Sequence, residues 1–173
     1  MNWYRKSQLK KIAEKTLYHG TSIDHMESIN RFGLEPRVGE FVRWGYDEYE
    51  EAGIKLPELV FATDKGDLRK AVTAMRQAVA VMLGKKFHEV NSRELQRYGL
   101  LVIIPGEQGS AEGAHGFQRR SPDSDTEWER YYSQDYPTVE PGDYFSENFI
   151  HPVKMLIGEK MIRFLNKTVP KIF

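Results

Sequence analysis

The most regular hydrophobic pattern in the chain predicts a long amphipathic helix that begins near residue 68 and ends before Gly84. Asp64 or Asp67 can cap its first turn, and glycine is favoured directly after a helix. Apolar side chains recur at helical spacing on one face: Leu68, Ala71, Val72, Met75, Val79 and Met82. We therefore expect this helix to pack on the core through that face.

Shorter apolar runs, bounded by turn residues, predict the strands. These runs are residues 16–19, 58–63, 99–104, 143–150 and 153–157, with residues 160–165 as a further strand. Two shorter helices are predicted over residues 3–15 and 23–32. A turn at residues 20–22 leads into the second helix, with Ser22 as its N-cap and Gly33 after its last residue. Because the strands gather late and few helices cross between them, this order predicts an α+β domain rather than a doubly wound sheet.

The composition narrows the class of protein. At 173 residues the chain fits one domain, and no apolar run approaches the roughly 20 residues needed to cross a membrane. The absence of cysteine excludes disulfides, thiolate metal sites and a cysteine nucleophile. A net charge of zero gives no overall basic footprint for nucleic acid. The first 15 residues are basic and lack a secretory signal, so a cytoplasmic location is the expectation.

Three segments, in order along the chain, carry a family resemblance. The first is residues 17–22 (LYHGTS) at a strand end, followed by a helix and a Gly-Leu-x-Pro exit. The second is residues 60–64 (VFATD), before the long helix, and the third is residues 144–150 (YFSENFI). Together they resemble the ADP-ribosyltransferase superfamily, in particular its His-Tyr-Glu branch, which includes diphtheria toxin and the poly(ADP-ribose) polymerases.

The resemblance implies an NAD⁺ site in a cleft between two packed, mostly antiparallel sheets with flanking helices. In such a site His19 hydrogen-bonds a ribose hydroxyl, and the backbone of Gly20 pairs with the nicotinamide carboxamide, with Thr21 beside it. An amide ligand is read well by one backbone N–H and one C=O, and glycine lets the ring approach closely. NAD⁺ binding through this architecture needs no Gly-rich phosphate loop, and the chain has none.

One aromatic position departs from the family pattern. Phe61 stands where the family has its tyrosine, in contact with the dinucleotide. The aromatic side chain that stacks on nicotinamide is left open among Tyr46, Tyr49 and Trp44, which precede the second segment.

The family's catalytic glutamate matches Glu147. By strand alternation Glu147 shares a face with Phe145 and Phe149, where an unpaired charge is costly, so a functional partner is expected. Phe145 also stands where the arginine-modifying branch has a second acidic residue. The resemblance thus implies that residues 1–173 form one NAD-dependent ADP-ribosyltransferase domain in which Glu147 and His19 are catalytic.

The resemblance places acceptor contacts in the loop before the catalytic strand, residues 128–143. Tyrosines of this loop and nearby arginines can stack on nucleic-acid bases, and they can equally contact a protein surface. The acceptor can therefore be either a protein or a nucleic acid. These tyrosines and arginines are Tyr131, Tyr132, Tyr136, Arg119, Arg120 and Arg130.

Two other functions stay open. An RNA 2′-phosphotransferase of the same fold also uses NAD⁺ and needs arginines around the phosphate, for which Arg31, Arg37 and Arg43 are available. The second alternative is a non-catalytic module that binds NAD⁺ or ADP-ribose without turnover. No metal site is expected, because His115 and His151 lack carboxylate or histidine partners at ligand spacing.

Overall fold

The computed structural model describes residues 16–38, 49–104, 117–123, 126–151 and 154–169. The predicted helix over residues 3–15 lies outside these residues, as do Trp44 and Tyr46.

The first sheet is antiparallel and has the strand order β1–β3–β6. β1 spans Leu17–Ser22, β3 spans Gly99–Ile104 and β6 spans Lys154–Ile157. β1 and β3 pair over their whole length. The strand predicted at residues 99–104 is confirmed, and so is the one at residues 153–157, from residue 154 onward.

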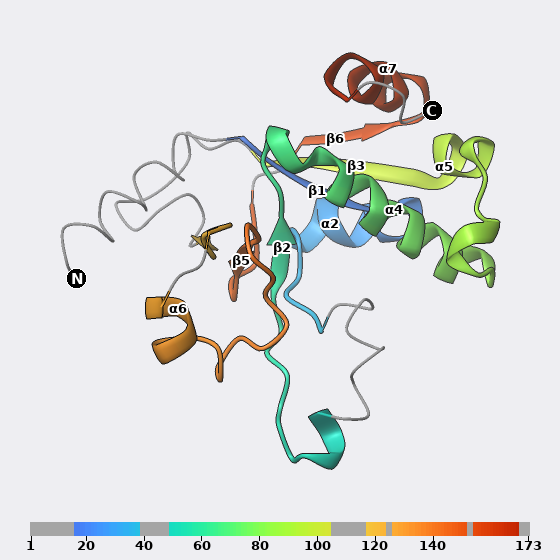
Figure 1. Cartoon of the computed structure of the whole chain (residues 1–173). Coiled ribbons are helices and arrows are strands. Elements are labelled where there is room, and N and C mark those ends of the chain that lie inside the picture. The colour runs from blue at the N-terminus through green and yellow to red at the C-terminus, as the bar shows by residue number, and fades with distance from the viewer. Residues whose placement is uncertain (1–15, 39–48, 105–116, 124–125, 152–153, 170–173) are drawn as a thin grey trace.

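The second sheet is also antiparallel, with the order β2–β5–β4. β2 spans Val60–Ala62, β5 spans Tyr144–Ser146 and β4 spans Gln118–Arg119. Tyr18 and Thr63 form an isolated antiparallel bridge that joins β1 to the end of β2. In Figure 1 the strands of the first sheet run across the view, while β2 and β5 run up and down. The described part of the chain is therefore an α+β fold with two small antiparallel sheets.

Within the described residues, four α-helices cover the outer faces of the sheets, and a fifth lies beside the layer between them. The four are α4 (Leu68–Leu83), α5 (Ser92–Tyr98), α6 (Thr126–Tyr131) and α7 (Gly158–Thr168), and the fifth is α2 (Met26–Phe32). α4 confirms the long helix predicted from periodicity, and Gly84 follows it with φ 66° in the left-handed region. Asp64 caps the short 3₁₀ turn before α4 by accepting from the backbone N–H of Gly66.

Three clusters of buried apolar side chains in the described residues define the layers. The first cluster lies between the first sheet and α4, α5 and α7. The second joins one face of β1 and β3 to β2 and β5, with α2 beside it. The third lies between the other face of β2 and β5 and α6. The order of layers is therefore helices, first sheet, second sheet, helix, as Figure 1 shows for α7 and α6 at opposite ends.

The close packing of α4 on β1 depends on Gly20. A Cβ atom at this position would overlap the carbonyl oxygen of Ala71 and crowd the Cβ of Met75, both on α4. Side chains alternate along a strand, so position 20 faces the same side as Tyr18, which packs in the cluster beneath α4. The absence of a side chain at Gly20 is therefore explained by helix packing, whatever its role towards a ligand.

Three segments differ from the prediction, of which the strand over residues 143–150 is described with the site. Residues 20–22 continue β1 instead of forming a turn, and the Ser22 side chain makes no capping hydrogen bond. The strand predicted at residues 160–165 is wrong, because these residues belong to α7. Met161 and Leu165 are both fully buried. A spacing of four residues falls on one face of a strand and of a helix alike, so this pattern did not separate the two.

We expect Gly20→Ala to lower the free energy of unfolding by roughly 1–3 kcal/mol, because the added methyl group forces α4 away from β1. Denaturant unfolding measures the loss. Gly66→Ala is the matched control, since a Cβ there meets only the Asp64 carboxylate, at 3.2 Å. An equal loss in both variants would contradict the packing role of Gly20.

Candidate active site at the junction of β1 and β2

His19 lies on β1 where the two sheets begin to separate. Its Nδ1 lies 2.6 Å from the carbonyl oxygen of Phe61 on β2. Because a carbonyl oxygen only accepts, Nδ1 carries the proton, and Nε2 of the neutral ring keeps a lone pair. The side chain is partly buried. His19 can therefore accept a hydrogen bond from a ligand hydroxyl through Nε2.

Burial is the main reason that the pKa of His19 lies below the ordinary histidine value. The hydrogen bond to the Phe61 carbonyl opposes this and raises the pKa, while the charge of His25 lowers it further. The net effect favours the neutral ring at pH 7, which is the form that leaves Nε2 as an acceptor.

The backbone of Gly20 faces β2 beyond the point where the two strands pair. Tyr18 and Thr63 exchange both backbone hydrogen bonds, and this isolated bridge does not extend to Gly20. Along an antiparallel strand the N–H and C=O groups of alternate residues point the same way, so those of Gly20 point away from β3, as those of Tyr18 do. The Phe61 carbonyl across from it is bonded to His19 instead. Gly20 thereby has one donor and one acceptor side by side, an arrangement that can pair with a carboxamide.

Phe61 and Thr21 are held largely by the core. Phe61 pairs with Phe145 in the β2–β5 ladder, and its ring packs against the cluster beneath α6. Thr21 is 8% exposed. Tyr49 is partly buried, and Tyr46 lies outside the described residues. Stacking of one of these aromatic side chains on nicotinamide stays a prediction.

Glu147 is exposed, in the bend that follows β5. The expectation that it shares a buried face with Phe145 and Phe149 is wrong, because the strand predicted over residues 143–150 ends at Ser146 and Phe149 is 55% exposed. The Tyr136 hydroxyl donates a hydrogen bond to Glu147 Oε1 at 3.2 Å. Sequence reasoning missed this partner, because the contact joins two loops and no spacing rule predicts it.

The two proposed catalytic side chains attach to the same strand pair. His19 is bonded to the backbone of Phe61, and Phe61 pairs with Phe145, two residues before Glu147. At about 3.3 Å per residue, this offset along the strand is roughly 7 Å. Within the described residues no hydrogen bond joins His19 directly to Glu147. The Glu147 carboxylate meets Tyr136 on the α6 side of the second sheet, whereas His19 lies at the junction with the first sheet.

The aromatic and arginine side chains expected to contact an acceptor also hold the second sheet together. Trp128 is 6% exposed, and the guanidinium of Arg120 lies 5.2 Å from the centre of its ring. Arg119 lies 5.0 Å above the ring of Tyr144. The side chain of Tyr131 is outside the description. The first contact ties the residue after β4 to α6, and the second ties β4 to β5.

Of the arginines available to a 2′-phosphotransferase, two are described and each has its own neighbour. Arg31 lies 5.3 Å from the centre of the Phe32 ring. Arg37 donates to Glu35 at 2.9 Å. Arg43 lies outside the described residues. The described pair therefore adds no support for a phosphate site.

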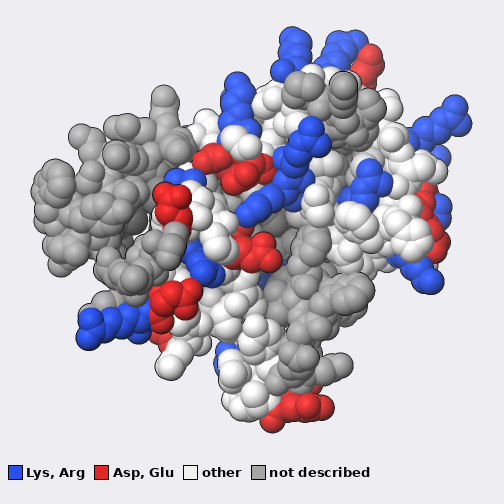
Figure 2. All heavy atoms as spheres, viewed as in Figure 1, with Lys and Arg blue, Asp and Glu red and all other residues white. Residues whose placement is uncertain are grey.

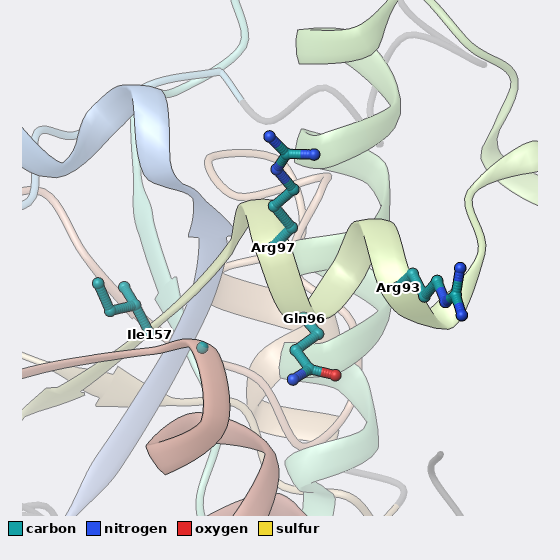
Figure 3. Close-up of a pocket in the computed structure, with 5 residues that line it drawn as sticks. Arg93, Gln96, Arg97 and Ile157 are labelled. Atoms are coloured by element: carbon teal, nitrogen blue, oxygen red, sulfur yellow. The ribbon is translucent and has the colours of Figure 1, made fainter.

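A hollow between α5 and the start of α7 lies at the other edge of the first sheet. Its lining residues are Arg93, Gln96, Arg97, Ile157 and Gly158. Figure 3 shows the side chains of Arg93 and Arg97 pointing away from each other. β6 borders this hollow, whereas His19 is on β1, at the opposite edge of the sheet. The two locations are therefore separate.

The described residues contain no group of three or more histidines and carboxylates placed to hold a metal ion. In the same part of the chain, no helix has the length and apolar character required to cross a membrane. Figure 2 shows acidic and basic side chains next to one another across the middle of the viewed face.

We expect acid to destabilise the protein through His19. Its pKa is lowered in the folded state, so unfolding takes up a proton below about pH 6.5, the unfolded value, and stability falls as the pH drops through that range. Melting temperatures between pH 7.5 and 5 should fall less steeply for His19→Gln than for the wild type. His88→Gln, at an exposed position, is the control and should keep the wild-type slope. Equal slopes for all three proteins would contradict the role of His19 in acid destabilisation.

Comparison of the chain with protein-family models, with curated protein sequences and with solved structures gave no match.

Proposed function

We propose that this protein is an NAD⁺-dependent ADP-ribosyltransferase, which cleaves the bond between nicotinamide and ribose and transfers ADP-ribose to a macromolecular acceptor. The observation that carries the proposal is the junction of β1 and β2. There, the N–H and C=O of Gly20 lie beyond the last bridge between the strands, and the neighbouring His19 holds the Phe61 carbonyl. Two small antiparallel sheets packed on each other are compatible with the fold of this superfamily.

The nicotinamide end of NAD⁺ would bind at this junction. Its carboxamide NH₂ would donate to the Gly20 carbonyl, and its carbonyl would accept from the Gly20 N–H. Nε2 of neutral His19 would accept a hydrogen bond from a ribose hydroxyl, since Nδ1 is already used by Phe61. Backbone groups fixed in a strand position a ligand well because they have no side-chain freedom to lose.

In the reaction, the bond between ribose C1′ and the pyridinium nitrogen breaks. Its electron pair stays on nitrogen, so nicotinamide leaves as a neutral molecule, and positive charge spreads over C1′ and the ribose ring oxygen. The Glu147 carboxylate would stabilise this charge and hydrogen-bond the 2′-hydroxyl. The acceptor then attacks C1′, and its proton passes to Glu147 and on to water. The exposed position of Glu147 supports this role, because a macromolecular acceptor must be able to reach it.

We expect Glu147→Gln to reduce nicotinamide release from NAD⁺ by roughly 100-fold or more, because the amide carries no negative charge and accepts no proton. NAD⁺ binding, measured by calorimetry, should change little, since Gly20 and His19 are untouched. Glu89→Gln makes the same chemical change at an exposed residue on another part of the surface and should keep full activity.

The assay adds NAD⁺ labelled in its adenylate part to the purified protein with cell extract. It then follows nicotinamide release together with label entering protein, DNA or RNA. Wild-type activity that survives in Glu147→Gln would remove Glu147 from the mechanism. NAD⁺ binding without any nicotinamide release would instead favour a binding module. Transfer of the 2′-phosphate from an added 2′-phosphorylated RNA, dependent on NAD⁺, would favour the phosphotransferase.

A further inference from the structure

We propose that Tyr136 is a positioning residue that holds the Glu147 carboxylate in one orientation for the transfer reaction. The inference rests on the proposed function for its catalytic meaning. It rests on a separate set of contacts for its physical basis. Those contacts lie on the α6 side of the second sheet, away from the junction that holds His19.

Tyr136 lies in the turn after α6, and its ring is fixed by other aromatic rings. The ring centre lies 5.0 Å from that of Phe145 and 6.3 Å from that of Trp128. Trp128 in turn packs edge-on against Phe145 at 5.6 Å. Phe145 is fully buried on β5, two residues before Glu147. The Tyr136 hydroxyl is therefore held by the same strand that leads into the glutamate.

The hydroxyl reaches Glu147 from this fixed ring. It donates to Oε1 at 3.2 Å, which leaves Oε2 for a ligand. An exposed glutamate outside regular structure samples several rotamers, and each must be given up when the carboxylate meets the ribose. A donor on a rigid ring removes part of that freedom before the ligand arrives, which is the usual benefit of a well-supported site.

The electrostatics of Tyr136 agree with this geometry. Burial is the main cause that raises its pKa, followed by the negative charge of Glu147 and the hydrogen bond to it. The tyrosine therefore stays protonated, and remains a donor, through the neutral pH range. The same coupling gives the contact a signature that can be measured without any catalytic assay.

The kinetic test is Tyr136→Phe, which keeps the ring and its packing and removes only the hydroxyl. We expect kcat for nicotinamide release to fall roughly 10-fold to 100-fold, with the KM for NAD⁺ and the melting temperature close to wild type. Tyr98→Phe, on α5 beyond the first sheet, is the control and should keep wild-type kinetics. In a Glu147→Gln background, Tyr136→Phe should add little further loss, because the carboxylate it positions is already absent. Additive losses, or a loss confined to KM or to stability, would overturn the positioning role.

The structural test is an NMR titration of the Tyr136 Cζ signal in protein labelled with ¹³C at tyrosine Cζ. The signal is assigned by its absence in Tyr136→Phe. Glu147→Gln should lower the pKa of Tyr136 towards the ordinary tyrosine value, since it removes the charge and the carboxylate hydrogen bond, whereas Glu89→Gln should not. An unchanged Tyr136 pKa in Glu147→Gln would show that the contact does not hold in solution and would overturn the proposal. A shifted pKa in a wild-type protein that releases no nicotinamide would support the contact and reject the proposed reaction.

Discussion

The bridge between Tyr18 and Thr63 sets the geometry of the whole candidate site. Each residue donates to the other's carbonyl at 2.8 Å, and this is where the edge of the first sheet meets the second. Past this bridge, α4 packs against β1 at Gly20. The His19 ring donates a hydrogen bond to the Phe61 carbonyl there. A ladder that continued past the bridge would satisfy these backbone groups within the protein and leave none to read a ligand. The function proposed for this chain thus depends on the end of the β1–β2 pairing at Tyr18 and Thr63.

The two proposed catalytic side chains are held by different means. His19 is tied to a backbone carbonyl at the sheet junction, which can move only if the strands move. Glu147 is tied to the hydroxyl of Tyr136, and that ring belongs to an aromatic cluster beneath α6. The first attachment suits a group that fixes the dinucleotide, and the second suits a group that must serve both the sugar and an incoming acceptor. Each of the two side chains is therefore held by a different layer of the structure.

Periodicity predicted the parts of the fold that bury long regular faces. α4 and β3 appear where the pattern placed them, because each has enough residues for its period to stand out. α5 was not predicted, since seven residues give too short a pattern, although its capping box of Asn91 and Glu94 is a readable signal. The end of β5 at Ser146 could not be read, because alternation says which side a residue faces only while the strand lasts.

The site was predictable as a set of residues but not as a set of contacts. His19, Gly20 and Glu147 followed from a family resemblance carried by three short segments. The partner of His19 is a main-chain atom 42 residues away, and any residue type at position 61 would supply it. The hydroxyl that meets Glu147 comes from a turn whose path depends on how Trp128 and Phe145 pack. Contacts of this kind follow from the assembled core and leave no trace in local spacing.

The overlap of two constraints at position 20 has a consequence for how this protein can diversify. The amide groups offered to a ligand and the hydrogen that lets Ala71 approach belong to one residue. A change that reshaped the pocket there would also separate the helix from the sheet, so natural variation and protein engineering are both barred from tuning selectivity at that point. Variants with altered ligand preference should instead arise on neighbouring loops, where a new side chain has room and no helix must move to admit it.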